Sequence, residues 1–392
     1  MENLQNNYSP LGTLSPSVTL SLAARAKELK KQGLDVYSMS VGEPDFDTPQ
    51  AIKDSAIKAL NEGKVGYIAS SGLPELKNEI VKKMATHGIK TTPENIIVTT
   101  GAKLALFETI TALCGAKDEV IVMAPYWLSY PEMIKASGAK MVTVNTKAEN
   151  NFAPTKEDLE QAITPNTKLI IVNSPSNPTG AVYSKETLSM IADIAVKNNI
   201  MVLSDEIYEK LIYDDKIKHI SIASLNEKIA DLTITINGFS KAYAMTGWRL
   251  GYLVAPSWLA KRISALQSHA TSNATTFVQY AAVTALQGKA DKELDNMVQT
   301  FAQRRKLLCK LLKEIPQISF IEPQGAFYVM CNIAKTNKTA KDFAQELLEQ
   351  KLLTVIPCES FGAPEYIRLS YACSEPQIIE SIKRLKEFCQ NL

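Results

Sequence analysis

The chain has 392 residues, of which 45% are hydrophobic and 21% charged, and its formal net charge is +2. A chain of this length and composition can bury a large core and is expected to divide into two domains. It has neither a basic stripe nor an acidic tail, so nothing favours binding to nucleic acid. No apolar run is long enough to span a bilayer, and the first residues lack the features of a signal peptide, so we expect a cytoplasmic protein.

The helix and strand patterns alternate along the first part of the chain. After an irregular arm, residues 19–31 carry a helical pattern and residues 36–41 form a short strand. Thr48 and Pro49 then begin a further helix, with Thr48 as the capping residue and Pro49 at the first helical position.

The middle of the chain predicts a buried sheet. Strand patterns cover 96–99, 120–123, 169–173, 201–204 and 232–236, and helical patterns cover 102–114 and 188–198. These strands are short and continuously apolar, which is typical of a mostly parallel sheet flanked by helices. After about residue 290 we predict a long charged amphipathic helix, isolated strands near 326–331 and 366–370, and a last helix from Pro376. The predicted fold class is α/β, with a large domain and a smaller α/β domain.

The cysteines and histidines give little support for a metal site. The six cysteines are scattered without a C-x-x-C spacing, so we expect reduced thiols. The three histidines, His87, His219 and His269, are isolated in the sequence. No metal is therefore expected, and a histidine general base is poorly supported.

The segment 237–251 contains an unusual lysine. Lys241 lies between Ser240 and Arg249 in a stretch that is otherwise apolar, aromatic or glycine-rich. Ser240 and Arg249 can both bind a phosphate. A lysine that is partly desolvated beside a cation loses proton affinity and becomes a nucleophilic amine. This combination predicts a phosphorylated aldehyde bound to Lys241 as a Schiff base, for which pyridoxal 5'-phosphate (PLP) is the obvious candidate.

The pattern S-K-x-x-x-M-x-G-x-R-x-G at 240–251 is specific. With it, the chain resembles the class I aminotransferases of PLP fold type I, and most of all their bacterial aspartate aminotransferase branch. The resemblance runs from about Pro16 to the C-terminus. It implies a large PLP-binding domain at 45–290 and a discontinuous small domain made of 1–44 plus 291–392. It also implies a homodimer with shared active sites, in which Tyr67 reaches the phosphate of the neighbouring subunit.

Ligands of an open parallel sheet bind at the carboxyl ends of the strands, so residues that follow strands are candidates. Gly101, Ala102 and Lys103 join a strand to a helix whose free N–H groups favour a phosphate. Trp127 follows the next strand and could stack on a flat ring. The resemblance gives Trp127 that place against the cofactor, and makes it and Asn177 candidates for contact with the substrate as well.

Three further residues are assigned to the cofactor. Asp205 ends an apolar strand, where a buried acid needs a partner, and a pyridinium N–H would provide one. The resemblance implies that Asn177 and Tyr208 hydrogen-bond the phenolic oxygen of the cofactor. Lys241, Asp205 and Tyr208 are the predicted catalytic residues.

The substrate is expected to bind through its carboxylates. Arg368 could pair with a protein carboxylate, but the pattern R-L-S-Y that it begins favours a clamp on the α-carboxylate of the substrate. Gly42 matches a glycine whose backbone lies near the same carboxylate. A second carboxylate needs a second cation; another branch of the family uses an arginine in the region of 268–273, where this chain has none. Lys103 is the candidate here, with Ser17 and Thr19 as neutral donors.

These assignments predict an enzyme of amino-acid metabolism that binds amino acids and 2-oxo acids. It would transfer the amino group of aspartate to 2-oxoglutarate by a ping-pong mechanism, giving oxaloacetate and glutamate, with Lys241 as general base and acid. Alternatives are an aromatic or broad-specificity aminotransferase and a PLP-dependent β-lyase. A non-catalytic PLP-binding regulatory module is disfavoured because no DNA-binding domain accompanies it. A nicotinamide-dependent dehydrogenase is disfavoured because G-x-G-x-x-G does not follow the first strand.

Overall fold

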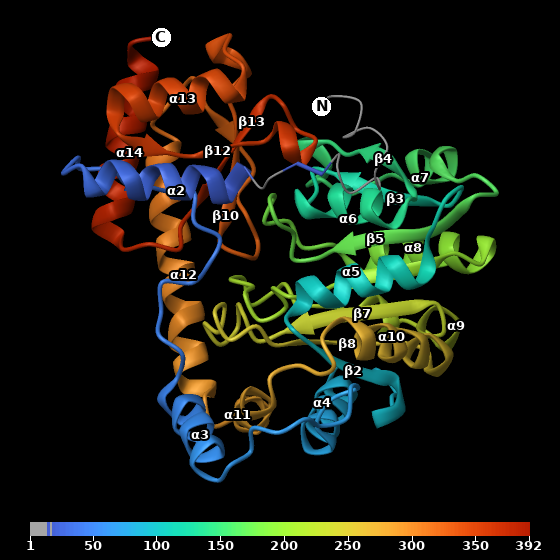
Figure 1. Ribbon diagram of the computed structural model, residues 1–392. Coiled ribbons are helices and arrows are strands. Elements are labelled where there is room, and N and C mark those ends of the chain that lie inside the picture. The colour runs from blue at the N-terminus through green and yellow to red at the C-terminus, as the bar shows by residue number, and fades with distance from the viewer. Residues whose placement is uncertain (1–13, 16–17) are drawn as a thin grey trace, which may run out of the picture.

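A seven-stranded sheet forms the centre of the computed structural model, which describes residues 14, 15 and 18–392 (Figure 1). Its strands lie in the order β2-β8-β7-β6-β5-β3-β4. Their bounds are β2 (Ile96–Thr99), β3 (Glu119–Ala124), β4 (Lys140–Asn145), β5 (Thr167–Asn173), β6 (Met201–Asp205), β7 (Thr233–Gly238) and β8 (Gly251–Val254). All pairs are parallel except those of β8, which is antiparallel to β2 and to β7. The mostly parallel sheet predicted from the sequence is therefore confirmed.

Helices cover both faces of this sheet. Successive residues of a strand face opposite sides, so Ile170 packs into one apolar cluster and Ile171 into the other. One face is covered by α5 (Ala102–Leu113), α6 (Ser129–Ser137) and α10 (Ser257–Ala270), and the other by α7 (Lys156–Ala162), α8 (Lys185–Asn198) and α9 (Glu227–Ala230). Burial on both faces explains why the central strands are continuous apolar runs.

Three more helices lie beyond β2, at the edge of the seven-stranded sheet. They are α3 (Gln50–Asn61), α4 (Pro74–Thr86) and α11 (Thr276–Leu286), and α11 contacts both of the others. The sequence predicts a cap at Thr48, but the structure differs. Pro49 is the N-cap residue of α3, and the Thr48 hydroxyl donates to the carbonyl oxygen of Ala244 at 2.8 Å. Thr48 therefore joins the start of α3 to the segment that follows Lys241.

A second group of elements is built from both ends of the chain. Its antiparallel sheet has the order β12-β13-β10-β9, and β1 pairs in parallel with β11. The strands are β1 (Tyr37–Ser38), β9 (Ser319–Phe320), β10 (Tyr328–Asn332), β11 (Leu353–Thr354), β12 (Ile356–Pro357) and β13 (Tyr366–Ser370), and the helices are α2 (Val18–Lys31), α12 (Asp291–Leu312), α13 (Ala340–Lys351) and α14 (Glu375–Gln390). The strand predicted at 36–41 shortens to β1, because only two residues pair with β11.

The N-terminal helix belongs to this second group. Figure 1 shows α2 in blue across the red C-terminal elements, and it contacts β1, β11 and β12. These contacts support the division into 45–290 and 1–44 plus 291–392, which we propose as the two domains. In the described part of the chain, no helix is both long and apolar enough to cross a membrane. The predicted cytoplasmic location stays a prediction.

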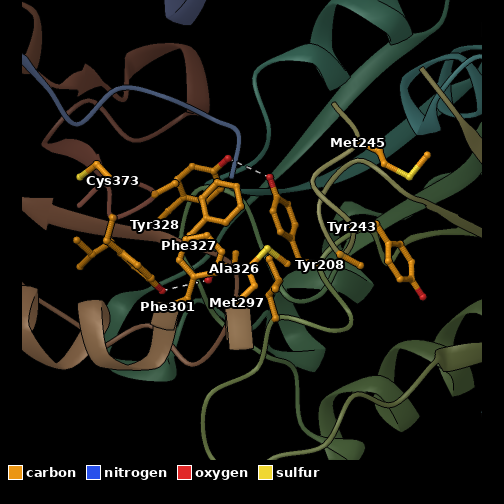
Figure 2. Packing of buried hydrophobic residues seen from close by; sticks show 14 of the residues in the cluster. Tyr208, Tyr243, Met245, Met297, Phe301, Ala326, Phe327, Tyr328 and Cys373 are labelled. Carbon is orange, nitrogen blue, oxygen red and sulfur yellow. Dashed lines mark hydrogen bonds between the residues drawn. The ribbon is translucent and has the colours of Figure 1, made fainter. Parts of the chain in front are cut away.

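The long helix α12 connects the two groups. Met297 and Phe301 on α12 pack into the same apolar cluster as Phe327 and Tyr208 (Figure 2). The rings of Phe301 and Phe327 are stacked with their centroids 5.4 Å apart. Because Tyr208 follows β6 and Phe327 precedes β10, this cluster joins the carboxyl edge of the large sheet to the second group.

Candidate active site

The predicted functional residues converge at the carboxyl edge of the central sheet. Asn173 ends β5, Asp205 ends β6 and pairs with Asn173 in register, and Lys241 follows β7. Strand ends of a parallel sheet meet along one edge, which is where open α/β sheets bind ligands. Residues far apart in the sequence are thereby brought to one place.

The amine of Lys241 points into this edge. Its Nζ donates a hydrogen bond to the carbonyl oxygen of Gly42 at 2.6 Å. The ring centroids of Tyr208 and Phe327 lie 6.0 and 5.9 Å from the same nitrogen. Gly42 lies between β1 and α3, so the N-terminal segment closes over the lysine.

The proton affinity of Lys241 is reduced. Burial lowers the pKa of its amine to about 8, although Glu43 favours the charged form. The charges of Arg249, Arg368 and Lys103 contribute to this lowering of the pKa. A lysine with this pKa is partly neutral near physiological pH and can act as a nucleophile or take up a proton.

Asp205 is a buried acid with a partner that the sequence did not predict. The Tyr130 hydroxyl donates to its Oδ2 at 2.7 Å, and the backbone N–H of Ile207 donates to Oδ1 at 3.3 Å. Burial raises the pKa of Asp205 to about 6, and the bond from Tyr130 acts in the opposite direction. The side-chain amide of Asn173 donates to the Asp205 carbonyl at 2.9 Å and fixes the strand end. A desolvated carboxylate held in this way favours a cationic partner.

Two glycines and a strained arginine form a site suited to an anion. Gly101 has a φ of +83°, and a Cβ on it would lie 2.4 Å from Nη2 of Arg249. A Cβ on Gly251 would lie 2.3 Å from the backbone nitrogen of Ala102. Arg249 has a φ of +54°, which is uncommon for a residue other than glycine and is typical of functional sites. The guanidinium is thus brought against the N-terminus of α5, where free N–H groups also favour an anion.

Ser240 and Lys103 are the other predicted neighbours of this site. Ser240 is buried and directly precedes Lys241. Lys103 lies in the first turn of α5 with its Nζ 4.9 Å from the ring centroid of Trp127. Burial lowers the pKa of Lys103, and the charge of Arg249 acts in the same direction. The Trp127 ring meets the Tyr130 ring edge to face at 5.4 Å.

Arg368 is buried, and no carboxylate among residues 14, 15 and 18–392 pairs with it. Its side chain donates through Nη1 to Oδ1 of Asn177 at 3.0 Å and through Nη2 to the carbonyl oxygen of Ser40 at 3.1 Å. Its Nε has no hydrogen-bond partner, and no acidic side chain of the described residues lies within salt-bridge distance. The rings of Tyr328 and Phe361 lie 4.3 and 5.3 Å from the guanidinium carbon. A protein salt bridge, the alternative left open by the sequence, is therefore absent among these residues.

Tyr208 and Tyr328 face each other across the site. Figure 2 shows their hydroxyls pointing together, and the two oxygens are 3.0 Å apart. A Cβ on Gly42 would lie 3.2 Å from the Tyr328 hydroxyl, so the glycine lets the chain pass close to this pair. Tyr328 and Ser40 were not predicted from the sequence, because a strand tyrosine and a serine carry no signal of their own.

The structure does not bring Tyr67 into this site. Tyr67 follows α3 and is 90% exposed. It contributes nothing to the site of its own chain, and its predicted contact with a second subunit stays a prediction. Ser17 lies outside the described residues, and the side chain of Thr19 is likewise not described.

Comparisons with known proteins agree with the chemistry of this site. The sequence model of the aminotransferase class I and II family matches residues 35–385. The chain therefore belongs to this aminotransferase family, and its fold is the α/β PLP fold type I. It is 43% identical to the aspartate aminotransferase of Bacillus subtilis (strain 168), over 97% of this chain and 98% of that protein.

Two other relatives bear on the range of substrates. The chain is 42% identical to a probable aspartate/prephenate aminotransferase of Aquifex aeolicus, over 98% of each chain. It is also similar to the solved aspartate aminotransferase of Thermus thermophilus with maleate, with a TM-score of 0.94 and 39% identity over 97% of this chain and 99% of that one. The chain is accordingly an aminotransferase.

Members of this family depend on PLP, and the residues at this edge fit that cofactor. The anion site at Arg249 and the start of α5 suits a phosphate. Asp205 is a buried acid whose raised pKa reflects desolvation, which a cationic ring nitrogen would offset. Lys241 has the lowered pKa that a Schiff-base lysine needs.

Proposed function

We propose that the protein transfers the amino group of aspartate to 2-oxoglutarate and so forms oxaloacetate and glutamate. The observation that carries this proposal is a pair of cations near the reactive amine. The charges of Arg368 and Lys103 both lower the pKa of the Lys241 amine. Arg368 also donates to the carbonyl oxygen of Ser40, two residues before the Gly42 carbonyl that accepts from Lys241. Arg368 lacks a carboxylate partner among the described residues, and a bidentate clamp on the substrate α-carboxylate would supply one.

A substrate with two carboxylates would use both cations. Lys103 lies at the rim beside Trp127, where its charge is partly desolvated. We assign it to the distal carboxylate of aspartate. The Bacillus relative is named an aspartate aminotransferase, and the Thermus relative was solved with maleate, a dicarboxylate. Both support a dicarboxylate substrate here.

We further propose how the chain holds PLP. Gly101, Ala102, Ser240 and Arg249 bind the phosphate, and Asp205 pairs with the ring nitrogen. Asn177 accepts a hydrogen bond from Arg368, and the Tyr208 hydroxyl contacts that of Tyr328. We assign the Asn177 amide and the Tyr208 hydroxyl to the phenolic oxygen of the cofactor. When bound, the cofactor withdraws electrons from the α-carbon of the amino acid.

We assign the proton transfer at the α-carbon to Lys241. Its free amine would remove the α-proton of the amino acid as general base and, in the reverse half-reaction, return a proton to the α-carbon as general acid. A pKa near 8 suits both directions of this transfer. Gly42 accepts a hydrogen bond from the amine and so directs it. Two successive half-reactions at one site give ping-pong kinetics.

A broader specificity that includes aromatic substrates is the second candidate. Lysine is a flexible point charge and not a planar fork, so Lys103 can turn away from an uncharged side chain. Tyr208 and Tyr328 supply aromatic surface near Arg368, and Trp127 supplies it beside Lys103. The Aquifex relative is named an aspartate/prephenate enzyme. Products formed from aspartate and 2-oxoglutarate would separate these alternatives from a β-lyase.

We propose a homodimer as the assembly. Tyr67 is 90% exposed, and three apolar side chains near it are exposed as well, Ile57, Leu60 and Val65. A second copy of the chain that covers this face would bury them and bring Tyr67 to the phosphate of its partner.

Replacement of Lys103 tests the choice of substrate. In Lys103→Ala, we expect kcat/KM for aspartate to fall roughly 10- to 100-fold, as for the loss of one charged hydrogen bond, while the value for phenylalanine is spared. Lys103→Arg should recover part of the activity with aspartate. Equal losses for aspartate and phenylalanine would mean that Lys103 serves the cofactor, and the assignment to aspartate would fail.

A further inference from the structure

A buried group of four potential metal ligands lies behind the cofactor edge. His87, Glu206, Glu209 and His219 each present one ligand atom, and these four atoms lie within 4.8 Å of one another. His87 follows the end of α4, Glu206 and Glu209 lie in the turn after β6, and His219 precedes the short 3-10 helix η4 (Ile222–Ser224). The two histidines are isolated in the sequence, and the packing of α4 against this turn is what joins them. We call these four residues the His2Glu2 cluster.

In each carboxylate of the cluster, Oε1 contacts a residue outside the cluster. The hydroxyls of Ser204 and Ser221 donate to Oε1 of Glu206 at 2.8 and 2.6 Å. Lys83 Nζ lies 2.5 Å from Oε1 of Glu209, and it also donates to the Tyr252 hydroxyl at 2.8 Å. Such outer contacts orient the carboxylates and leave their second oxygens toward the histidines, as around metal sites.

The Oε2 atoms of Glu206 and Glu209 face the two imidazoles, but not all of these polar atoms form hydrogen bonds. Oε2 of Glu206 is 2.9 Å from Nε2 of His219. Oε2 of Glu209 has no hydrogen-bond partner among the described residues, although the side chain is only 3% exposed. Nδ1 of His87 lies 3.5 Å from that oxygen and also lacks a hydrogen bond. An unpartnered carboxylate oxygen buried to this extent is costly unless a cation binds it.

One pair of ligand atoms has the spacing of a tetrahedral ion, whereas Glu206 and His219, at 2.9 Å, are joined by a hydrogen bond that the ion would replace. Two ligands bound to one zinc ion at about 2.0–2.1 Å lie roughly 3.4 Å apart when the geometry is tetrahedral. The 3.5 Å between His87 and Glu209 matches this separation. Two imidazoles and two carboxylates suit Zn²⁺ or Co²⁺, whereas Mg²⁺ and Ca²⁺ prefer six or more oxygen ligands.

We propose that His87, Glu206, Glu209 and His219 bind one divalent ion of the zinc class at a structural site. Four protein ligands leave no open position for a substrate. The ion holds the end of α4 to the turn that carries Asp205 and Tyr208, and so fixes two residues of the cofactor site from behind.

Lys83 and protons compete with the metal ion for the atoms of the His2Glu2 cluster. Lys83 pairs with Oε1 of Glu209 and donates to the Tyr252 hydroxyl, so this lysine and the ion share the Glu209 carboxylate. An imidazole binds a metal ion only in its neutral form, so binding should strengthen as the pH rises.

Metal titration of the untagged holoenzyme tests the proposal. After treatment with a chelator, calorimetry with Zn²⁺ should give one equivalent per chain, and bound Zn²⁺ should raise Tm. Co²⁺ should produce the visible bands of a four-coordinate ion, at longer wavelength than the cofactor absorbs. The wild-type protein alone decides the matter, because failure to bind one equivalent would overturn the proposal whatever the variants do.

Variants identify the ligands. Glu209→Gln and His87→Gln should each weaken Zn²⁺ binding by at least about 10-fold, as altered metal sites do. His269→Gln is the matched control, because His269 is the remaining histidine of the sequence and is exposed. It should bind like the wild type. Unchanged binding in the first two variants, or loss in the control, would place any ion elsewhere. None of these readouts uses transamination, so they stand apart from the proposed function.

Discussion

The reactivity of Lys241 comes from its surroundings. Its amine is buried beside three cations, which lowers its pKa to about 8. Below this pKa the amine is protonated and cannot attack an aldehyde, so capture of PLP by the cofactor-free protein should speed up as the pH rises through about 8 and then level off. Borohydride reduction followed by mass spectrometry would measure the captured fraction against time. A rate that continues to climb to about pH 10.5 would mean an ordinary lysine.

Removal of the same side chain tests its role in catalysis. Lys241→Ala should abolish transamination but leave PLP bound without a covalent link, because Asp205, Ser240 and Arg249 remain. Absorbance after gel filtration would measure the bound cofactor, and oxaloacetate formation would measure turnover. A variant with nearly full turnover would eliminate Lys241 as the catalytic residue.

Asp205 is expected to tune the cofactor electrostatically. Asp205→Ala should lower kcat at least ~10²-fold, a loss comparable to that of other preorganised groups. Asp205→Glu keeps the charge and should be much milder. Tyr130→Phe removes the hydrogen bond that favours the ionised acid, so it should cause a smaller loss than Asp205→Ala. If both substitutions of Asp205 are equally mild, the residue is structural.

At the scale of elements, the start of α5 depends on the backbone of Gly101. The φ of +83° and the 2.4 Å approach of a Cβ to Arg249 leave no room for a side chain. Gly101→Ala should therefore move Arg249 away from the helix N-terminus and weaken PLP binding. Fluorescence titration of the cofactor-free variant would measure its Kd, and Gly115→Ala, at a position with open space, is the control. Equal affinity in Gly101→Ala and the wild type would contradict this account of the phosphate site.

Some elements could not be read from the sequence. The central strands were predicted because burial on both faces makes them apolar runs. By contrast, β4 lies at the sheet edge with exposed and half-exposed residues, and β8 is short and begins with Gly251. Tyr130 was missed because Pro131 interrupts the helical pattern of α6. The His2Glu2 cluster was missed because its members come from three separate segments. Lys241 and Arg249 could be predicted because both belong to one specific sequence pattern at 240–251.

At the scale of the whole molecule, we expect a dimer. Light scattering after size-exclusion chromatography should give about twice the chain mass of 43.1 kDa. Tyr67→Phe removes one neutral hydrogen bond to the phosphate, so PLP affinity should fall roughly 3- to 10-fold while the dimer persists. A fully active monomer at assay concentration would contradict the proposed shared sites.

The most direct test of the whole account is a single half-reaction. Holoenzyme mixed with aspartate, without any 2-oxo acid, should lose the absorbance of the aldehyde form of the cofactor and release one oxaloacetate per active site. Addition of 2-oxoglutarate should restore the original spectrum and yield one glutamate per site. An unchanged spectrum with aspartate, or release of ammonia with no amino group stored on the enzyme, would contradict the assignment of this protein as an aspartate-using aminotransferase.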